Sequence, residues 1–194
     1  MGLGKTVQVI ALLLGRKQSR QPSSRRNAPR ASLLVVPASL IANWKSELAR
    51  FAPSLAVCIA HPSEMPTGAD EAGQAAESCD VVITTYSMLI RLDWMRARKW
   101  DLVVLDEAQA IKNAAARQSR TVKELKSVGR IAMTGTPVEN RLDDLWSIFD
   151  FLNPGLLGSA KAFSGVAKKL ESASGARFGP LRSLVQPYIL RRLK

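Results

Sequence analysis

Short apolar runs, rich in β-branched residues, recur along the chain, and each is followed by a stretch with helix-like spacing of its apolar residues. Continuous apolar runs are typical of parallel strands that are covered on both faces, whereas apolar spacings of three and four are typical of amphipathic helices. The predicted strands are Leu33–Val36, Ala56–Ala60, Asp80–Thr84, Asp101–Leu105 and Arg130–Thr134. The predicted helices are Lys5–Gly15, Leu40–Phe51, Ser87–Arg91, Ala114–Lys126 and Leu142–Leu152. Strands that alternate with helices predict an α/β fold with a doubly wound parallel sheet.

Two segments interrupt this alternation. Residues 18–30 are rich in Ser, Arg and Pro, which predicts a flexible basic loop on the surface. Beyond Pro154 the strand pattern stops, and helices of small residues are separated by Gly, Ser and Pro. A length of 194 residues suits one domain with a sizeable core. We therefore expect one α/β domain over residues 1–154 and a helical extension over residues 155–194.

Composition narrows the class of protein. The two cysteines, Cys58 and Cys79, lack the spacing of a metal site or a redox motif, so we expect reduced thiols in a cytosolic compartment. The single histidine, His61, precedes Pro62, which argues against a histidine-based triad or zinc cluster. No apolar run reaches transmembrane length, and the first residues do not have the pattern of a signal peptide.

The formal net charge of +12 is concentrated in two tracts. Residues 16–30 hold six basic residues and no acid, while residues 159–194 hold eight basic residues and one acid, Glu171. The remainder of the chain is close to neutral. Two basic tracts on a neutral body favour a polyanionic partner, and two solvated surface segments are the alternative.

The first candidate site is Gly4-Lys5-Thr6, which directly precedes the apolar helix pattern. Small residues let backbone N–H groups approach a phosphate, the lysine can reach the β- and γ-phosphates, and the threonine hydroxyl can bind Mg²⁺. The full phosphate-loop pattern also requires a small residue five positions before Gly4, which would precede Met1. The tripeptide alone is therefore a weak signal for nucleotide binding.

A second candidate site is the acidic pair Asp106 and Glu107, which ends the apolar run that starts at Asp101. Neighbouring strand residues project in different directions, so one carboxylate can hold Mg²⁺ while the other orients water. The alternative interpretation is that both acids are simply solvated at the end of a strand. That interpretation does not explain why a Gly-Lys-Thr motif occurs in the same fold. The third candidate is the turn at residues 134–137, Thr-Gly-Thr-Pro, which turn chemistry alone would also explain.

In this order the three motifs resemble the first lobe of superfamily 2 helicase-like ATPases, with Asp106-Glu107-Ala108-Gln109 as the acidic motif. Further matches resemble the SWI/SNF branch, the double-stranded DNA translocases and remodellers. These matches are Val36–Trp44, Ile83–Tyr86, Thr134–Asn140, Asp144–Trp146, Phe151–Pro154 and Pro187–Arg192. The acidic motif is more similar to bacterial members, and the resemblance covers essentially the whole chain.

The resemblance implies a P-loop NTPase fold of the RecA-like type that binds ATP and Mg²⁺. The residues that it implies for phosphate binding are Gly2, Leu3, Gly4, Lys5 and Thr6. Mg²⁺ would be held by Thr6 and Asp106. Glu107 would activate the attacking water, and Gln109 would sense the nucleotide beside it. The residues implied to couple nucleotide state to lobe movement are Thr134, Gly135 and Thr136.

The same resemblance implies contacts with the DNA backbone. These contacts would come from Ser39, Thr84, Thr85 and Tyr86. Trp44 lies in a matching segment, but a buried aromatic on a helix is more often a core residue, and we expect it in the core.

The family pattern also contains parts that this sequence lacks. Met1 aligns with an internal methionine of the phosphate loop, so we expect a lobe that is truncated at both ends and lacks its first strand. That loss predicts an apolar gap beside the strand that carries Asp106. The second lobe supplies arginines to the nucleotide, and an arginine finger is worth about 10³–10⁵-fold in turnover. The chain alone is therefore expected to be a very poor ATPase.

The interpretation is the nucleotide-binding lobe of an ATP-dependent double-stranded DNA translocase or remodeller. Its expected partners are duplex DNA and a second RecA-like lobe, with no membrane. Its expected location is the cytoplasm and nucleoid of a bacterium, or the nucleus of a eukaryote. The alternatives are a non-catalytic remnant of such a lobe and a lobe of an RNA or single-strand helicase.

Overall fold

A parallel β-sheet of five strands forms the centre of the computed structural model, which describes residues 4–19, 31–64, 73–135, 142–171 and 178–190. The strands are β1 (Ser32–Val36), β2 (Val57–Ala60), β3 (Val81–Thr85), β4 (Lys99–Leu105) and β5 (Lys126–Ala132). Their order is β2-β3-β1-β4-β5, and every pair is parallel. The predicted α/β class and the parallel sheet are confirmed.

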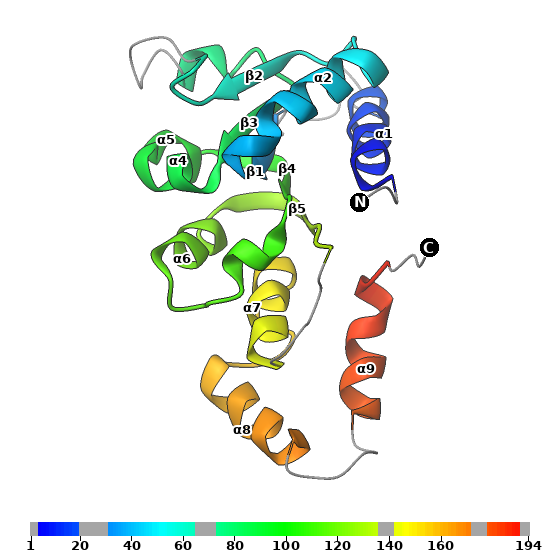
Figure 1. Ribbon diagram of the computed structural model, residues 1–194, viewed down its shortest axis with the longest axis vertical. Coiled ribbons are helices and arrows are strands. Elements are labelled where there is room, and N and C mark those ends of the chain that lie inside the picture. Colours follow the sequence, from blue (N-terminus) through cyan, green and yellow to red (C-terminus); the bar gives the residue numbers. More distant parts are fainter. Residues whose placement is uncertain (1–3, 20–30, 65–72, 136–141, 172–177, 191–194) are drawn as a thin grey trace.

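Helices cover both faces of the sheet, as a doubly wound fold requires (Figure 1). On one face lie α1 (Lys5–Gln18) and α2 (Ile41–Phe51), whose buried residues pack against Leu34, Val36 and Val104. The helices on the other face are α4 (Tyr86–Arg91), α5 (Asp93–Ala97), α6 (Arg117–Lys123) and α7 (Leu142–Leu152). They pack against Leu33, Val35 and Val103, because alternate residues of one strand point to opposite faces.

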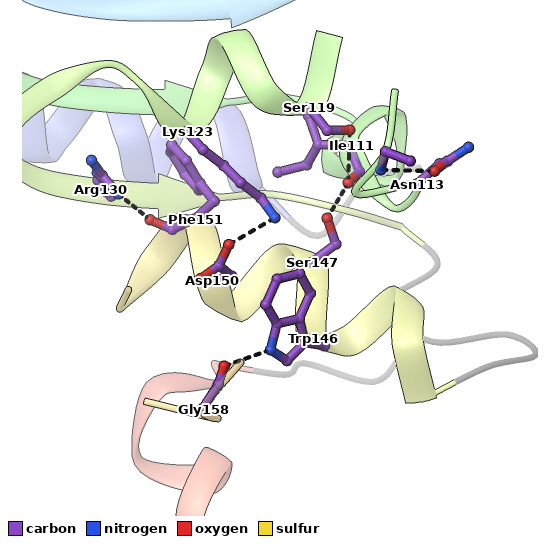
Figure 2. A network of polar contacts seen from close by, with 11 residues as sticks. Ile111, Asn113, Ser119, Lys123, Arg130, Trp146, Ser147, Asp150, Phe151 and Gly158 are labelled. Carbon is purple, nitrogen blue, oxygen red and sulfur yellow. Dashed lines mark hydrogen bonds and ion pairs between the residues drawn. The ribbon is translucent and has the colours of Figure 1, made fainter. Parts of the chain in front are cut away.

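Polar contacts fix α7 to its neighbours (Figure 2). Lys123 of α6 pairs with Asp150 at 2.9 Å, and its ammonium lies 4.5 Å from the centre of the Trp146 ring. Arg130 of β5 donates a hydrogen bond of 2.6 Å to the carbonyl oxygen of Phe151. The Trp146 indole donates to the carbonyl of Gly158 at 3.0 Å, which ties α7 to the chain that leads into the next helix.

Beyond residue 154 the described chain is helical, as expected, with α8 (Ala160–Glu171), α9 (Gly179–Val185) and the short 3-10 helix η3 (Gln186–Tyr188). Figure 1 shows α8 beyond α7, away from the sheet, and α9 to the side of α7. No helix in the described ranges is both long and apolar enough to cross a lipid bilayer.

Two expectations from the sequence are wrong. The strand that carries Asp106 at its end, β4, has no apolar gap beside it, since it pairs with β1 on one side and β5 on the other. Within the described residues the sheet edges are β2 and β5. Cys58 and Cys79 are not free thiols but form a disulfide, with Cα atoms 6.1 Å apart. Cys58 lies on β2 and Cys79 two residues before its neighbour β3, a proximity that comes from strand pairing and not from sequence spacing.

Candidate functional site

The helix α1 begins at Lys5, directly after Gly4, whose backbone is left-handed with φ of 68°. Glycine adopts this conformation without the steric cost that a side chain adds. No side chain among the described residues caps the helix, so the N–H groups of its first turn point outward without intrahelical partners. Such a terminus favours an anion, which is the property that the predicted phosphate site requires. Gly2 and Leu3 lie outside the described residues.

The side chain of Lys5 extends toward the turn that follows β5. A Cβ atom built on Gly135 would lie 4.0 Å from the Lys5 ammonium nitrogen, so the two residues are close neighbours although they are 130 positions apart in the sequence. The first and third predicted motifs therefore meet in space. Thr136, the third residue of the predicted coupling motif, lies outside the described residues.

A chain of hydrogen bonds joins the third motif to the second. The Thr134 hydroxyl lies 2.8 Å from Gln109 Oε1, and Gln109 Nε2 donates to Glu107 Oε2 at 2.7 Å. The backbone supports this chain, because the N–H of Ala108 donates to the carbonyl of Met133 at 2.8 Å. Gln109 thus bridges Glu107 and Thr134, a position in which it can report a change at one to the other.

Glu107 has an unusual backbone. Its φ is 49°, which makes it the only residue other than glycine with a positive φ in the described part of the chain. Side chains rarely tolerate this conformation, and residues held in it are concentrated at active sites. The turn directs the Glu107 carboxylate toward Gln109 instead of continuing the strand, so the half-buried acid lies beside the three motifs.

Asp106 is buried at the carboxyl end of β4, with 8% of its surface exposed. Its Oδ1 accepts the N–H of Glu107 at 3.0 Å, and its Oδ2 accepts the indole N–H of Trp44 at 2.8 Å. Each carboxylate oxygen has a second lone pair, so both can still bind a cation or its water. Oxygen ligands are those that Mg²⁺ prefers. The carboxylate and the half-exposed hydroxyl of Thr6, in the first turn of α1, therefore fit a Mg²⁺ that accompanies a bound phosphate.

Trp44 is a core residue, as expected, with 1% of its surface exposed. Its hydrogen bond to Asp106 could not be found from the sequence. Helical periodicity indicates that position 44 faces the sheet, but not which group its indole nitrogen meets across 62 residues.

Three of the four residues predicted to contact DNA have buried side chains. The Thr84 hydroxyl donates to the carbonyl of Ala60 at 3.0 Å, and the Thr85 hydroxyl accepts the N–H of Met88 as the cap of α4. The Tyr86 hydroxyl donates to the backbone carbonyl of Asp106 at 2.7 Å. These hydroxyls serve the fold and do not face solvent, unlike that of the exposed Ser39.

Burial raises the pKa of Tyr86 above its ordinary value, and the negative charges of Asp106 and Glu107 raise it further. The phenol therefore stays protonated, and remains a hydrogen-bond donor, throughout the physiological range of pH. The exposed hydroxyl of Ser87, 3.0 Å from that of Thr85, is a polar group in this segment that the sequence did not single out.

The profile of the SNF2-related domain family matches residues 1–194, the full length of the chain. The chain belongs to this family. It is 42% identical over 197 residues to the putative ATP-dependent helicase/translocase YwqA of Bacillus subtilis, covering all of this chain and 21% of that protein. It is 34% identical over 221 residues to the TATA-binding protein-associated factor mot1 of Schizosaccharomyces pombe, covering all of this chain and 11% of that protein.

Solved structures agree with the family. The SWI2/SNF2 ATPase core of Sulfolobus solfataricus in complex with dsDNA superposes with a TM-score of 0.84 and 40% identity, covering 99% of this chain and 38% of that one. Another structure of the same core domain superposes with a TM-score of 0.81 and 41% identity, covering 99% of this chain and 37% of that one. The fold is therefore that of a RecA-like lobe. This SNF2-related domain spans about a fifth of the length of the bacterial relatives that it matches.

Part of the first basic tract is neutralised within this SNF2-related domain. Arg16 forms a two-pronged ion pair with Asp101, at 2.8 and 2.6 Å, and Lys17 contacts Asp80 at 2.7 Å. These two cations fix the C-terminal end of α1 to the amino ends of β4 and β3. The remaining basic residues of the tract fall outside the described ranges, so the predicted polyanion contact of this tract rests on them.

Proposed function

We propose that this chain is the nucleotide-binding lobe of a motor that hydrolyses ATP and moves along double-stranded DNA together with a second RecA-like lobe. The observation that carries the proposal is the convergence of three distant motifs. Lys5 lies against Gly135, and the Thr134–Gln109–Glu107 chain connects that turn to the acids at the end of β4. A cradle, a cation ligand and a base in one place are the parts that phosphoryl transfer to water needs.

The residues take the following parts in this proposal. The N-terminus of α1 and the ammonium of Lys5 hold the phosphates, with Gly2, Leu3 and Gly4 supplying the loop. Thr6 and Asp106 would hold Mg²⁺, which would neutralise charge on the phosphates. Glu107 accepts a hydrogen bond from the attacking water and orients it. Gln109, with Thr134, Gly135 and Thr136, relates the state of the nucleotide to movement between the lobes.

DNA contact is proposed for the exposed edge of the lobe. Ser39 lies on η1 (Ala38–Leu40), before α2, and its side chain is free to meet a phosphate. For residues 84–86 the buried hydroxyls leave the backbone and the neighbouring Ser87 as the contacting groups. Support for duplex DNA comes from the likeness to the SWI2/SNF2 core, whose structure holds dsDNA. The chain alone is proposed to hydrolyse ATP very slowly, because the arginines of a second lobe are part of the site.

Steady-state ATP hydrolysis by the complete protein tests this function. Turnover is measured without nucleic acid and with equal nucleotide concentrations of duplex DNA, single-stranded DNA and RNA, with Lys5→Ala as the inactive control. We expect duplex DNA to stimulate the wild type most. Greater stimulation by RNA or single strands would favour a helicase of that class, and no turnover under any condition would favour a non-catalytic remnant.

A further inference from the structure

The hydrogen bond from Trp44 to Asp106 joins two groups that are buried on different elements. The donor lies on α2 and the acceptor at the end of β4, and the bond length of 2.8 Å is typical of a donor and a charged acceptor. The indole has only one donor, and that donor could have met a backbone carbonyl, as the indole of Trp100 does with Met95 at 2.9 Å. The indole N–H of Trp44 instead donates its hydrogen bond to a carboxylate.

The second oxygen of the same carboxylate is also held. Asp106 Oδ1 accepts the N–H of Glu107, so the two hydrogen bonds fix both the rotamer and the plane of the carboxylate. With both oxygens held, the remaining lone pairs point in set directions. A ligand oxygen that is pre-oriented in this way costs less entropy when it binds a cation than one that rotates freely.

We propose that Trp44 is a positioning residue for the cation at this site, acting through Asp106 and touching neither nucleotide nor metal. This inference rests on the proposed function, because it assumes that Asp106 is a ligand of Mg²⁺. Hydrogen-bond partners of metal ligands orient them, and their loss costs about 10–100-fold in metal affinity or activity.

The position of Trp44 gives this contact a second consequence. Trp44 lies in the first turn of α2, directly after the short 3-10 helix η1, in which Ala38 and Ser39 are exposed and Leu40 is partly buried. One hydrogen bond thus connects the helix that follows this turn to Asp106.

The test compares Trp44→Phe with Trp100→Phe in the complete protein. Both changes shrink a buried tryptophan and remove one indole hydrogen bond, but only the first releases Asp106. Binding of a fluorescent ATP analogue is measured at rising Mg²⁺ and in EDTA. We expect Trp44→Phe to raise the Mg²⁺ concentration for half-maximal binding about 10-fold, with binding in EDTA unchanged and turnover recovering at high Mg²⁺. Trp100→Phe should leave the Mg²⁺ dependence as in the wild type.

An unchanged Mg²⁺ dependence in Trp44→Phe would overturn the inference and leave the tryptophan a purely structural role. If the wild-type protein binds the nucleotide equally well with Mg²⁺ and in EDTA, that result would instead contradict the proposed function itself. If Trp44→Phe does not fold, position 44 takes β-(3-benzothienyl)alanine, which keeps the shape of the indole and replaces its N–H with sulfur. The same 10-fold shift is then expected, and its absence overturns the inference equally.

Discussion

The carbonyl oxygen of Ile111 is a buried junction between three elements. Ile111 ends η2 (Ala108–Ile111), the 3-10 helix that carries Gln109. The Ser119 hydroxyl of α6 donates to this oxygen at 3.1 Å, and the Ser147 hydroxyl of α7 donates at 2.6 Å (Figure 2). All three residues are fully buried. The junction therefore holds the segment next to the candidate site against both helices.

The two hydrogen bonds share one acceptor, so their losses are not expected to add. Ser147→Ala alone should cost about 1 kcal/mol of unfolding free energy, because Ser119 still satisfies the carbonyl. Ser119→Ala should cost about the same for the same reason. The double variant leaves a buried carbonyl without these donors, and an unsatisfied group of this kind costs about 1–3 kcal/mol more. We expect a total of about 3–5 kcal/mol, against about 2 kcal/mol from simple addition.

Urea unfolding of the two single variants, the double variant and the wild type measures these differences. Ser46→Ala, on the exposed face of α2, is the matched control and should stay within about 0.5 kcal/mol of the wild type. In a thermal melt, each lost kcal/mol should lower Tm by about 2–4 °C for a domain of this size. A double variant whose loss equals the sum of the singles within about 0.5 kcal/mol would refute the shared-acceptor argument.

Three further predictions concern charge and pH. Asp101→Asn should lower the unfolding free energy by about 1–2 kcal/mol, less than a fully buried pair, because Arg16 is partly exposed; an unchanged urea midpoint would contradict this. Because the pKa of Tyr86 is raised in the fold, this residue contributes fully to folding stability below about pH 10, and its contribution falls at higher pH as the phenol ionises in the unfolded chain. Between pH 9 and pH 11, the melting temperature of Tyr86→Phe should therefore fall less than that of the wild type. In duplex titrations, neutralising Arg25 and Arg26 should flatten the salt slope by about 0.9 per lost phosphate contact, whereas an equal slope would make the tract solvated surface.

The sequence was most informative where both faces of an element are buried. β1 and β4 are continuous apolar runs because helices cover them on both sides, and their predicted bounds are correct to within two residues. β5 is an edge strand that begins four residues before the prediction, at Lys126, where polar residues pair with the start of β4. α5 was missed because its five residues contain a single buried side chain, Met95, which leaves no periodicity to read.

For the site, the motifs predicted which residues are involved but not how they touch. Lys5 and the turn at Gly135 meet because the N-terminus of α1 lies near the carboxyl end of β5, the side of a parallel sheet on which the motifs were expected. The contact between Trp44 and Asp106 depends on how α2 packs on the sheet, and no local pattern encodes it. The disulfide and the buried hydroxyl of Tyr86 likewise depend on tertiary packing.

The central claim is that Lys5, Asp106 and Glu107 form one site in which ATP is bound and hydrolysed. Glu107→Gln in the complete protein tests it most directly, because the amide keeps the size and the contact with Gln109 but cannot act as a base. Mg·ATP binding and duplex-stimulated turnover are measured side by side. We predict wild-type nucleotide affinity with turnover reduced at least about 100-fold, the usual worth of a general base. A Glu107→Gln enzyme that turns over ATP at the wild-type rate would contradict the account.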